Sequence, residues 1–371
     1  MNFDNVTEWR IPVNGIQRDV LKVTRNNVVL WEKETIDYTE PFYVENNKDH
    51  SSFVNFTTYG DNPPNLAIYY STDRNMWQFL GNTSYGALSL SVPSKSKIWF
   101  RCRTDAWSNI NNRNIIKWGD KIGGNIMSML YGATFTGNET AFPGSSTYQF
   151  HWMFNESDIT DASKLILPAT TVADHCYTYM FRNCTSLVKP PKILPATVLA
   201  SYCYGYMFQG CTSLTSAPAL PAITLTKYCY QRMFFGCTSL TSAPALPATT
   251  LAGGCYGGMF YGCTSLTTAP ELPATALNAD CYSAMFSGCT SLTQAPELPA
   301  TTLTVYCYYQ MFQNCTSLNN IKCLANNIST SSSISNWVQN VSSTGTFTKK
   351  AGVTWPTGTS GIPSGWTVVE Q

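Results

Sequence analysis

Cysteine is the residue type whose spacing in this chain most strongly suggests chemistry. The 371 residues include fourteen cysteines, which could supply a disulfide framework, zinc ligands or reactive thiols. Twelve of them fall into two series, with a step of 27 residues once and of 26 residues thereafter. The first series is Cys176, Cys203, Cys229, Cys255, Cys281 and Cys307; the second is Cys184, Cys211, Cys237, Cys263, Cys289 and Cys315.

The two cysteines of one repeat follow the pattern C-x7-C. If the segment between them is helical, the sulfurs lie about 12 Å apart, which is too far for one zinc ion or one disulfide. Equivalent cysteines of neighbouring repeats could bond in an oxidising medium. We favour a ladder of small buried thiols, because a chain completed in the cytoplasm keeps its sulfur reduced. Cys102 alternates with Ile98 and Phe100 and is expected in a core.

The other reactive residue types give little sign of an active site. The three histidines, His50, His151 and His175, have no second histidine, carboxylate pair or nucleophile motif at useful spacing. No phosphate-binding loop, dinucleotide fingerprint, nucleophile elbow or glycosidase carboxylate pair is recognisable. We therefore predict a non-enzymatic protein without catalytic residues, metal or cofactor, although scattered carboxylates leave an unfamiliar hydrolase open.

The cysteines belong to a repeat that is clearest in PATTLAGGCYGGMFYGCTSLTTAPEL, from Pro247 to Leu272. Cys255, Met259 and Cys263 stand four apart, a spacing that predicts a short helix, and Gly262 is expected to end it in the left-handed conformation. The Thr-Ser-Leu-Thr and Ala-Pro segments that follow favour one short strand per repeat before proline stops the ladder. A fixed period in the twenties is typical of a solenoid.

The flanking segments predict β structure. A hairpin is expected around Arg25-Asn26-Asn27, and alternating apolar runs between Asp37 and Trp118 favour an immunoglobulin-like β-sandwich. The predicted fold class is therefore α+β, with an α/β solenoid of about six 26-residue coils between terminal caps. The predicted divisions are a docking segment at 1–36, the β-domain at 37–118, caps at 119–160 and 326–371, and the solenoid at 161–325.

Two resemblances sharpen this expectation. The segment GCTSLTTAPELPAT, together with CYxxMF, resembles the BspA-like class of leucine-rich repeats over roughly residues 145 to 325, although Ala-Pro and the first cysteine series depart from that pattern. The whole order, from WRIPVNGIQRDVLKVTRNNVVLWE through GGNIMSMLYG and the array to SGIPSGWTV, resembles structural proteins of gut Bacteroides phages, including the crAss-like group. These resemblances imply a leucine-rich-repeat-like array in a fibre, spike or head-decoration protein.

Composition narrows the expected partners. Charged residues are 12% of the chain, and 23 Lys+Arg nearly cancel 22 Asp+Glu, so nucleic acid and anionic membrane surfaces are disfavoured. We see no export signal and no run of roughly 18 apolar residues, and expect no membrane insertion. The expected location is the virion surface after assembly in the bacterial host cytoplasm. The N-terminal region would contact other virion proteins, and homo-oligomerisation is left open.

Rings at positions that vary between repeats are candidates for contact with a host-cell glycan or protein. They are Tyr202, Tyr228, Phe235, Tyr261 and Tyr306. The alternative for each ring is packing between neighbouring units, and the invariant tyrosines that follow the first cysteine of each unit are expected to be structural. Two other functions stay open: a bacterial BspA-like cell-surface adhesin, and a glycan-active hydrolase that uses the β-domain as a binding module.

Overall fold

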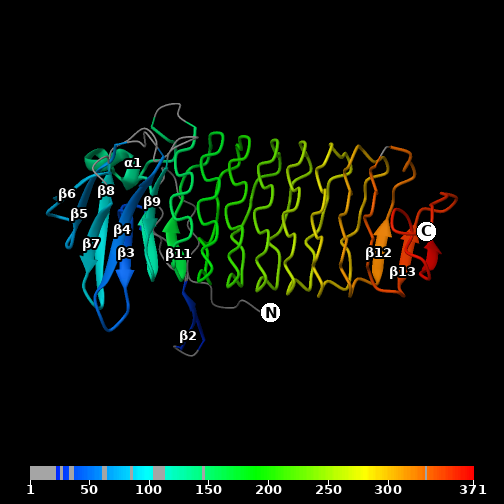
Figure 1. The fold of residues 1–371 in the computed structure, drawn as a ribbon, viewed down its shortest axis with the longest axis horizontal. Coiled ribbons are helices and arrows are strands. Elements are labelled where there is room, and N and C mark those ends of the chain that lie inside the picture. The colour runs from blue at the N-terminus through cyan, green and yellow to red at the C-terminus, as the bar shows by residue number, and fades with distance from the viewer. Residues whose placement is uncertain are drawn as a thin grey trace.

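The computed structural model describes residues 22–25, 28–32, 37–60, 65–83, 87–102, 113–143, 147–330 and 332–371. A β-domain lies at one end, and an elongated stack of repeat units extends from it to the C-terminus (Figure 1). Most of the predicted docking segment, including Asn26 and Asn27, lies outside the described residues. Within that segment β1 (Lys22–Arg25) and β2 (Val28–Glu32) pair antiparallel.

The β-domain consists of two sheets packed together. The larger sheet has the order β11-β10-β3-β8-β5-β6, and the smaller has the order β7-β4-β9. The strands are β3 (Tyr43–Asn46), β4 (Ser52–Tyr59), β5 (Ala67–Ser71), β6 (Gln78–Asn82), β7 (Leu88–Val92), β8 (Ser96–Cys102), β9 (Arg113–Lys117), β10 (Lys121–Asn125) and β11 (Asp161–Ile166). Phe56 on β4 and Phe100 on β8 are buried with ring centroids 5.3 Å apart, so the core lies between the sheets.

The larger sheet joins the β-domain to the repeats. β10 pairs antiparallel with β3 and parallel with β11, so this sheet crosses the predicted division at residue 118. A parallel bridge between Asp161 and Lys189 continues the pairing into the next repeat unit. The β-domain therefore supplies hydrogen-bond partners to the first unit of the stack.

The predicted α+β class with an α/β repeat solenoid is wrong. In the part of the chain that the structure describes, the only α-helix is α1 (Ser128–Tyr131), next to a 3-10 turn at Gly132–Thr134, and no CYxxMFxGC segment is helical. The strands form four separate sheets, and the central repeats pair mainly through isolated bridges such as Thr224 with Thr250. Pro244, Pro247 and their equivalents offer no N–H, so the predicted strand of each repeat does not develop into a continuous sheet.

Each predicted helix is instead a series of four-residue turns. In the clearest unit Gly254, Gly258 and Gly262 have φ of 61°, 61° and 70°, so every fourth residue is left-handed. N–H groups of alternate residues, such as Met259 to the Tyr256 carbonyl at 3.0 Å, close the turns within the unit. Apolar side chains four apart still share one face, and the sequence pattern alone did not separate this arrangement from a helix.

The remaining N–H groups of these turns all point toward the next repeat unit. Residues 254, 256, 258, 260 and 262 donate to carbonyls of the next unit at 2.7 to 3.0 Å. At the beginning of the stack, the Ile116 amide donates to the Met153 carbonyl and the Lys117 ammonium donates to the carbonyls of Asn155 and Glu156. At the far end, the Asn336 amide donates to the Ser360 hydroxyl at 2.9 Å. The first carbonyls of the stack therefore have donors in the β-domain, and an amide of the last unit has an acceptor in the C-terminal segment.

Aromatic rings run through the interior of the stack. Tyr177, Tyr204, Tyr230, Tyr256, Tyr282 and Tyr308 are buried, with successive ring centroids 5.5 to 6.2 Å apart. Trp337 continues this interior column and stacks on Trp355 at 5.7 Å. A parallel sheet of β12 (Asn320–Cys323), β13 (Thr346–Lys349) and β14 (Thr367–Glu370) accompanies the tryptophans at the C-terminal end.

Two glycines of the stack provide a matched test of this geometry. A side chain at Gly254 would overlap the ring of Tyr228, whereas one at Gly236 would meet nothing within 4 Å. Gly236→Ala should lower the free energy of unfolding by roughly 1–2 kcal/mol, because alanine resists the left-handed conformation. Gly254→Ala should cost about 1–3 kcal/mol more, since the ring must also move. Urea unfolding of both variants measures the difference, and equal losses would contradict the packing described.

Candidate binding surfaces

The cysteine ladder is entirely interior. All fourteen cysteines are buried and carry no disulfide. In the second series each thiol donates to the phenylalanine carbonyl of the preceding unit at 2.9 to 3.1 Å, as Cys211 does to Phe181. Burial raises the pKa of the Cys184, Cys263 and Cys315 thiols to about 12. These sulfurs therefore stay protonated and pack as small apolar groups, without the thiolate character that a nucleophile needs.

The structure brings together some of the predicted surface rings and separates others. Tyr202 and Tyr228 stack on each other with ring centroids 4.7 Å apart. Phe235 and Tyr261 form a second pair, also 4.7 Å apart, at another position of the repeat. Tyr306, which is 41% exposed, lies three units beyond Tyr228 in the same series. The two positions between them hold Gly254 and Asp280, so no ring connects Tyr306 to the first pair. The five predicted residues therefore do not form one site.

Two adjacent columns of rings emerge on the first units of the stack. The first column contains Tyr148, His175, Tyr202 and Tyr228, and the second contains Trp152, Tyr179 and Tyr206. Neighbouring centroids within a column are 4.5 to 4.8 Å apart. All seven residues have positive φ, between 53° and 66°. We call these seven residues, with Arg182 and Arg232, the ring surface.

One guanidinium group, that of Arg182, lies beside the second column, and Arg232 occupies the next equivalent position after Tyr206. The Arg182 guanidinium carbon is 5.4 Å from the Trp152 ring centroid and 5.8 Å from that of Tyr179. Arg232 lies 6.0 Å from the Tyr206 ring centroid and 5.5 Å from that of Phe235. Burial lowers the pKa of His175, with Asp174 opposing the shift, so this imidazole is mainly neutral near pH 7. The surface thus combines ring edges, phenol hydroxyls and two cations.

Sequence reasoning missed most of this surface. The predicted helix gives Tyr148, Trp152, Tyr179 and Tyr206 no common position, because a helix lacks the left-handed corners on which these residues stand. A signal was available in Gly254, Gly258 and Gly262, since three glycines four residues apart are unfavourable in a helix but suit repeated left-handed corners. The rings of earlier units occupy the repeat positions equivalent to Gly254 and Gly258.

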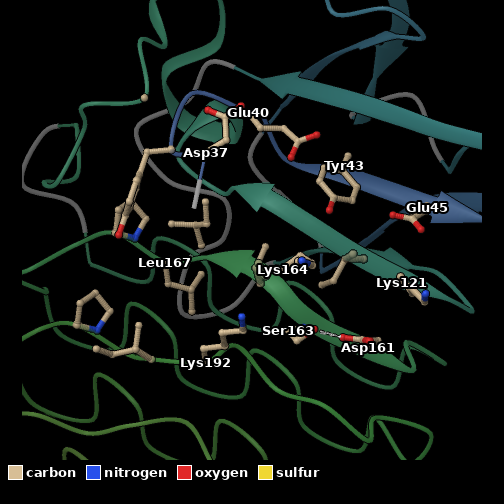
Figure 2. A pocket seen from close by; sticks show the side chains of 18 of the residues that line it. Asp37, Glu40, Tyr43, Glu45, Lys121, Asp161, Ser163, Lys164, Leu167 and Lys192 are labelled. Carbon is tan, nitrogen blue, oxygen red and sulfur yellow. Dashed lines mark hydrogen bonds between the residues drawn. The ribbon is translucent and has the colours of Figure 1, made fainter. Parts of the chain in front are cut away.

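A groove of 870 Å³ lies where the β-domain meets the first repeat units. Figure 2 shows Glu40, Tyr43 and Glu45 on one side and Lys164, Leu167 and Lys192 on the other. We call it the junction groove. Its lining also includes the carboxylates of Asp37 and Asp161 and the ammonium groups of Lys97 and Lys121.

Acidic and basic side chains lie next to each other in the junction groove. Glu40 Oε1 accepts from Lys97 Nζ and from Trp99 Nε1, each at 3.1 Å. Lys97 Nζ also lies 3.7 Å from the ring centroid of Tyr43. Burial and the nearby carboxylates, of which Glu40 contributes most, raise the pKa of Tyr43, so its hydroxyl remains protonated. The groove therefore presents fixed donors and acceptors beside a neutral phenol.

Comparison with known proteins gives no relative: no protein-family model, curated protein or solved structure matches the chain. Over the described residues, no helix combines the length and apolar character needed to cross a membrane. In the same residues, no group of three or more histidine, cysteine or acidic side chains is arranged to hold a metal ion.

Proposed function

We propose that this protein is a non-enzymatic component of a phage particle, a fibre, spike or head decoration, that binds a host-cell glycan or protein through the ring surface. The phage assignment rests on the sequence resemblance. The binding assignment rests on one structural observation: seven rings occupy consecutive left-handed backbone positions in the first units. The equivalent positions of later units hold Arg232, Gly254, Gly258, Asp280, Ala284, Tyr306 and Gln310.

The energetics of these positions support a role in binding. A left-handed conformation costs a residue with a side chain roughly 1–2 kcal/mol. One stacked aromatic pair returns about 0.5–1.5 kcal/mol. Because the two effects nearly cancel, stability alone gives little reason to place rings there instead of glycine. Strained positions of this kind are typical of functional surfaces.

The same geometry supplies a clean binding test. Tyr202→Gly and Tyr206→Gly remove two rings from positions where glycine fits the backbone, so the double variant should fold with a stability change of about 1 kcal/mol or less. We expect it to lose tenfold or more in binding of labelled protein to a panel of gut Bacteroides strains, measured by flow cytometry. Asp280→Gly with Ala284→Gly, at the equivalent positions three units away, is the matched control and should bind normally.

Unchanged binding by the Tyr202 and Tyr206 variant would remove the ring surface from the proposal. The particle assignment has its own test, since mass spectrometry of purified virions should detect the protein. Its absence from virions made by a host that expresses it would refute the particle assignment.

A further inference from the structure

The junction groove contains a hydroxyl group that the fold does not use. Tyr43 is 4% exposed, and its hydroxyl has no hydrogen-bond partner among the described residues. A side chain at Gly123 would overlap this hydroxyl, so the glycine leaves the space that the phenol occupies. Tyr43 lies on the groove wall in Figure 2, beside Glu45 and across β10 from Lys164. A phenol placed in this way is available to a ligand in the groove.

The charged groups around Tyr43 have opposite charges beside them but retain hydrogen-bonding capacity. Lys97 is paired with Glu40, Lys121 stands opposite Glu45 in the strand register, and Asp161 lies 3.8 Å from Lys189. A carboxylate can accept about four hydrogen bonds and an ammonium group can donate three, so pairing leaves positions unused. A ligand with a net charge would disturb this balance, whereas hydroxyl groups can donate to the carboxylates and accept from the lysines.

The rest of the groove suits the same kind of ligand. Leu167, Pro168, Ile193 and Pro195 line it beside the polar groups. Pyranose rings carry C–H groups on one face and hydroxyls at the rim, and therefore match a wall of this composition. The groove volume of 870 Å³ lies within the range of small-molecule sites, about 300–1,000 Å³.

We propose that the junction groove is a binding site for a neutral, hydroxyl-rich carbohydrate, with the Tyr43 hydroxyl as a direct hydrogen-bond partner. The site is formed by the β-domain and the strand side of the first repeats, and shares no residue with the ring surface. It therefore does not depend on the proposed role of the ring surface.

The test uses the full chain and a panel of neutral oligosaccharides: fragments of mannan, dextran, galactan and xylan. Titration calorimetry and saturation-transfer NMR should detect binding of at least one fragment. Tyr43→Phe should weaken it roughly threefold to tenfold, the effect of one hydrogen bond. Glu45→Gln should weaken it similarly, while the control Tyr69→Phe, on β5 and outside the groove lining, should not. Affinity should change less than twofold between low salt and roughly 1 M salt, where the Debye length is only about 3 Å.

Three results would overturn the groove proposal: no fragment binds at 10 mM, Tyr43→Phe binds as well as the unaltered protein, or only charged saccharides bind and salt abolishes their binding. The variant with Tyr202→Gly and Tyr206→Gly should retain oligosaccharide binding in the groove. Loss of cell binding in that variant, with groove binding intact, separates the two sites.

Discussion

We expect the protein to unfold cooperatively between about pH 9 and 10, below the pKa of about 10.4 of an ordinary lysine side chain. Burial raises the pKa of Cys102, Cys184 and Cys323 to about 12, and every other cysteine is also buried. An unfolded thiol has a pKa of about 8.5. Because the folded pKa is the higher one, the stabilising contribution is complete below about pH 8.5 and is lost as the pH rises toward the folded value.

The size of this effect follows from the number of thiols. Each one that ionises only in the unfolded chain removes about 1.4 kcal/mol of stability per pH unit. Fourteen such groups would exceed the total stability of an ordinary domain, about 5–15 kcal/mol, within roughly one pH unit. Urea midpoints measured at pH 7, 8, 9 and 9.5 should fall with increasing steepness.

A control variant removes two thiols outside the two series. Cys102→Ala with Cys323→Ala should reduce the steepness of the alkaline loss by about one seventh, because two of fourteen ionising groups are gone. A urea midpoint that stays constant from pH 7 to pH 10 would show that the thiols are not protected as described.

Trp337→Ala should cause the largest loss of stability from a single substitution, about 3–5 kcal/mol. Trp337 is fully buried, stacks between Tyr308 and Trp355, and donates its indole N–H to the Gly361 carbonyl at 2.8 Å. Its removal opens a cavity at the end of the interior column of rings and leaves that carbonyl without its donor.

The loss should also be local, since each unit contacts mainly its neighbours. Hydrogen exchange should accelerate first in residues 320–371, while β4 in the β-domain keeps its protection. Trp337→Phe retains a ring and should lose less than half as much stability. Uniform acceleration along the chain would contradict a stack held together unit by unit.

Sequence reasoning identified the repeat and its buried positions but not its backbone. The spacing of Cys255, Met259 and Cys263 predicts one inward face, and all three are buried. A helix and a series of four-residue turns both produce this spacing, so side-chain periodicity did not determine the hydrogen bonds. Tyr202 and Arg232 at left-handed corners obscured the difference, because side chains other than Gly and Asn rarely adopt that conformation.

The sequence did not predict the junction groove, for a different reason. Tyr43 and Lys97 lie on neighbouring strands of the β-domain, while Lys164 and Lys192 lie near the beginning of the repeats. Only the pairing of β10 with both β3 and β11 brings these segments together. No local motif marks a site that depends on a junction between separately predicted parts.

The one-way hydrogen bonds make the internal junctions interchangeable. Every unit offers the same row of amides to its successor and the same row of carbonyls to its predecessor. A gene change that adds or deletes a whole number of 26-residue units would therefore leave no backbone group unmatched. The distance between the β-domain and the C-terminal tryptophans could vary in fixed increments, so the chain has the properties of an adjustable spacer whose two ends stay constant.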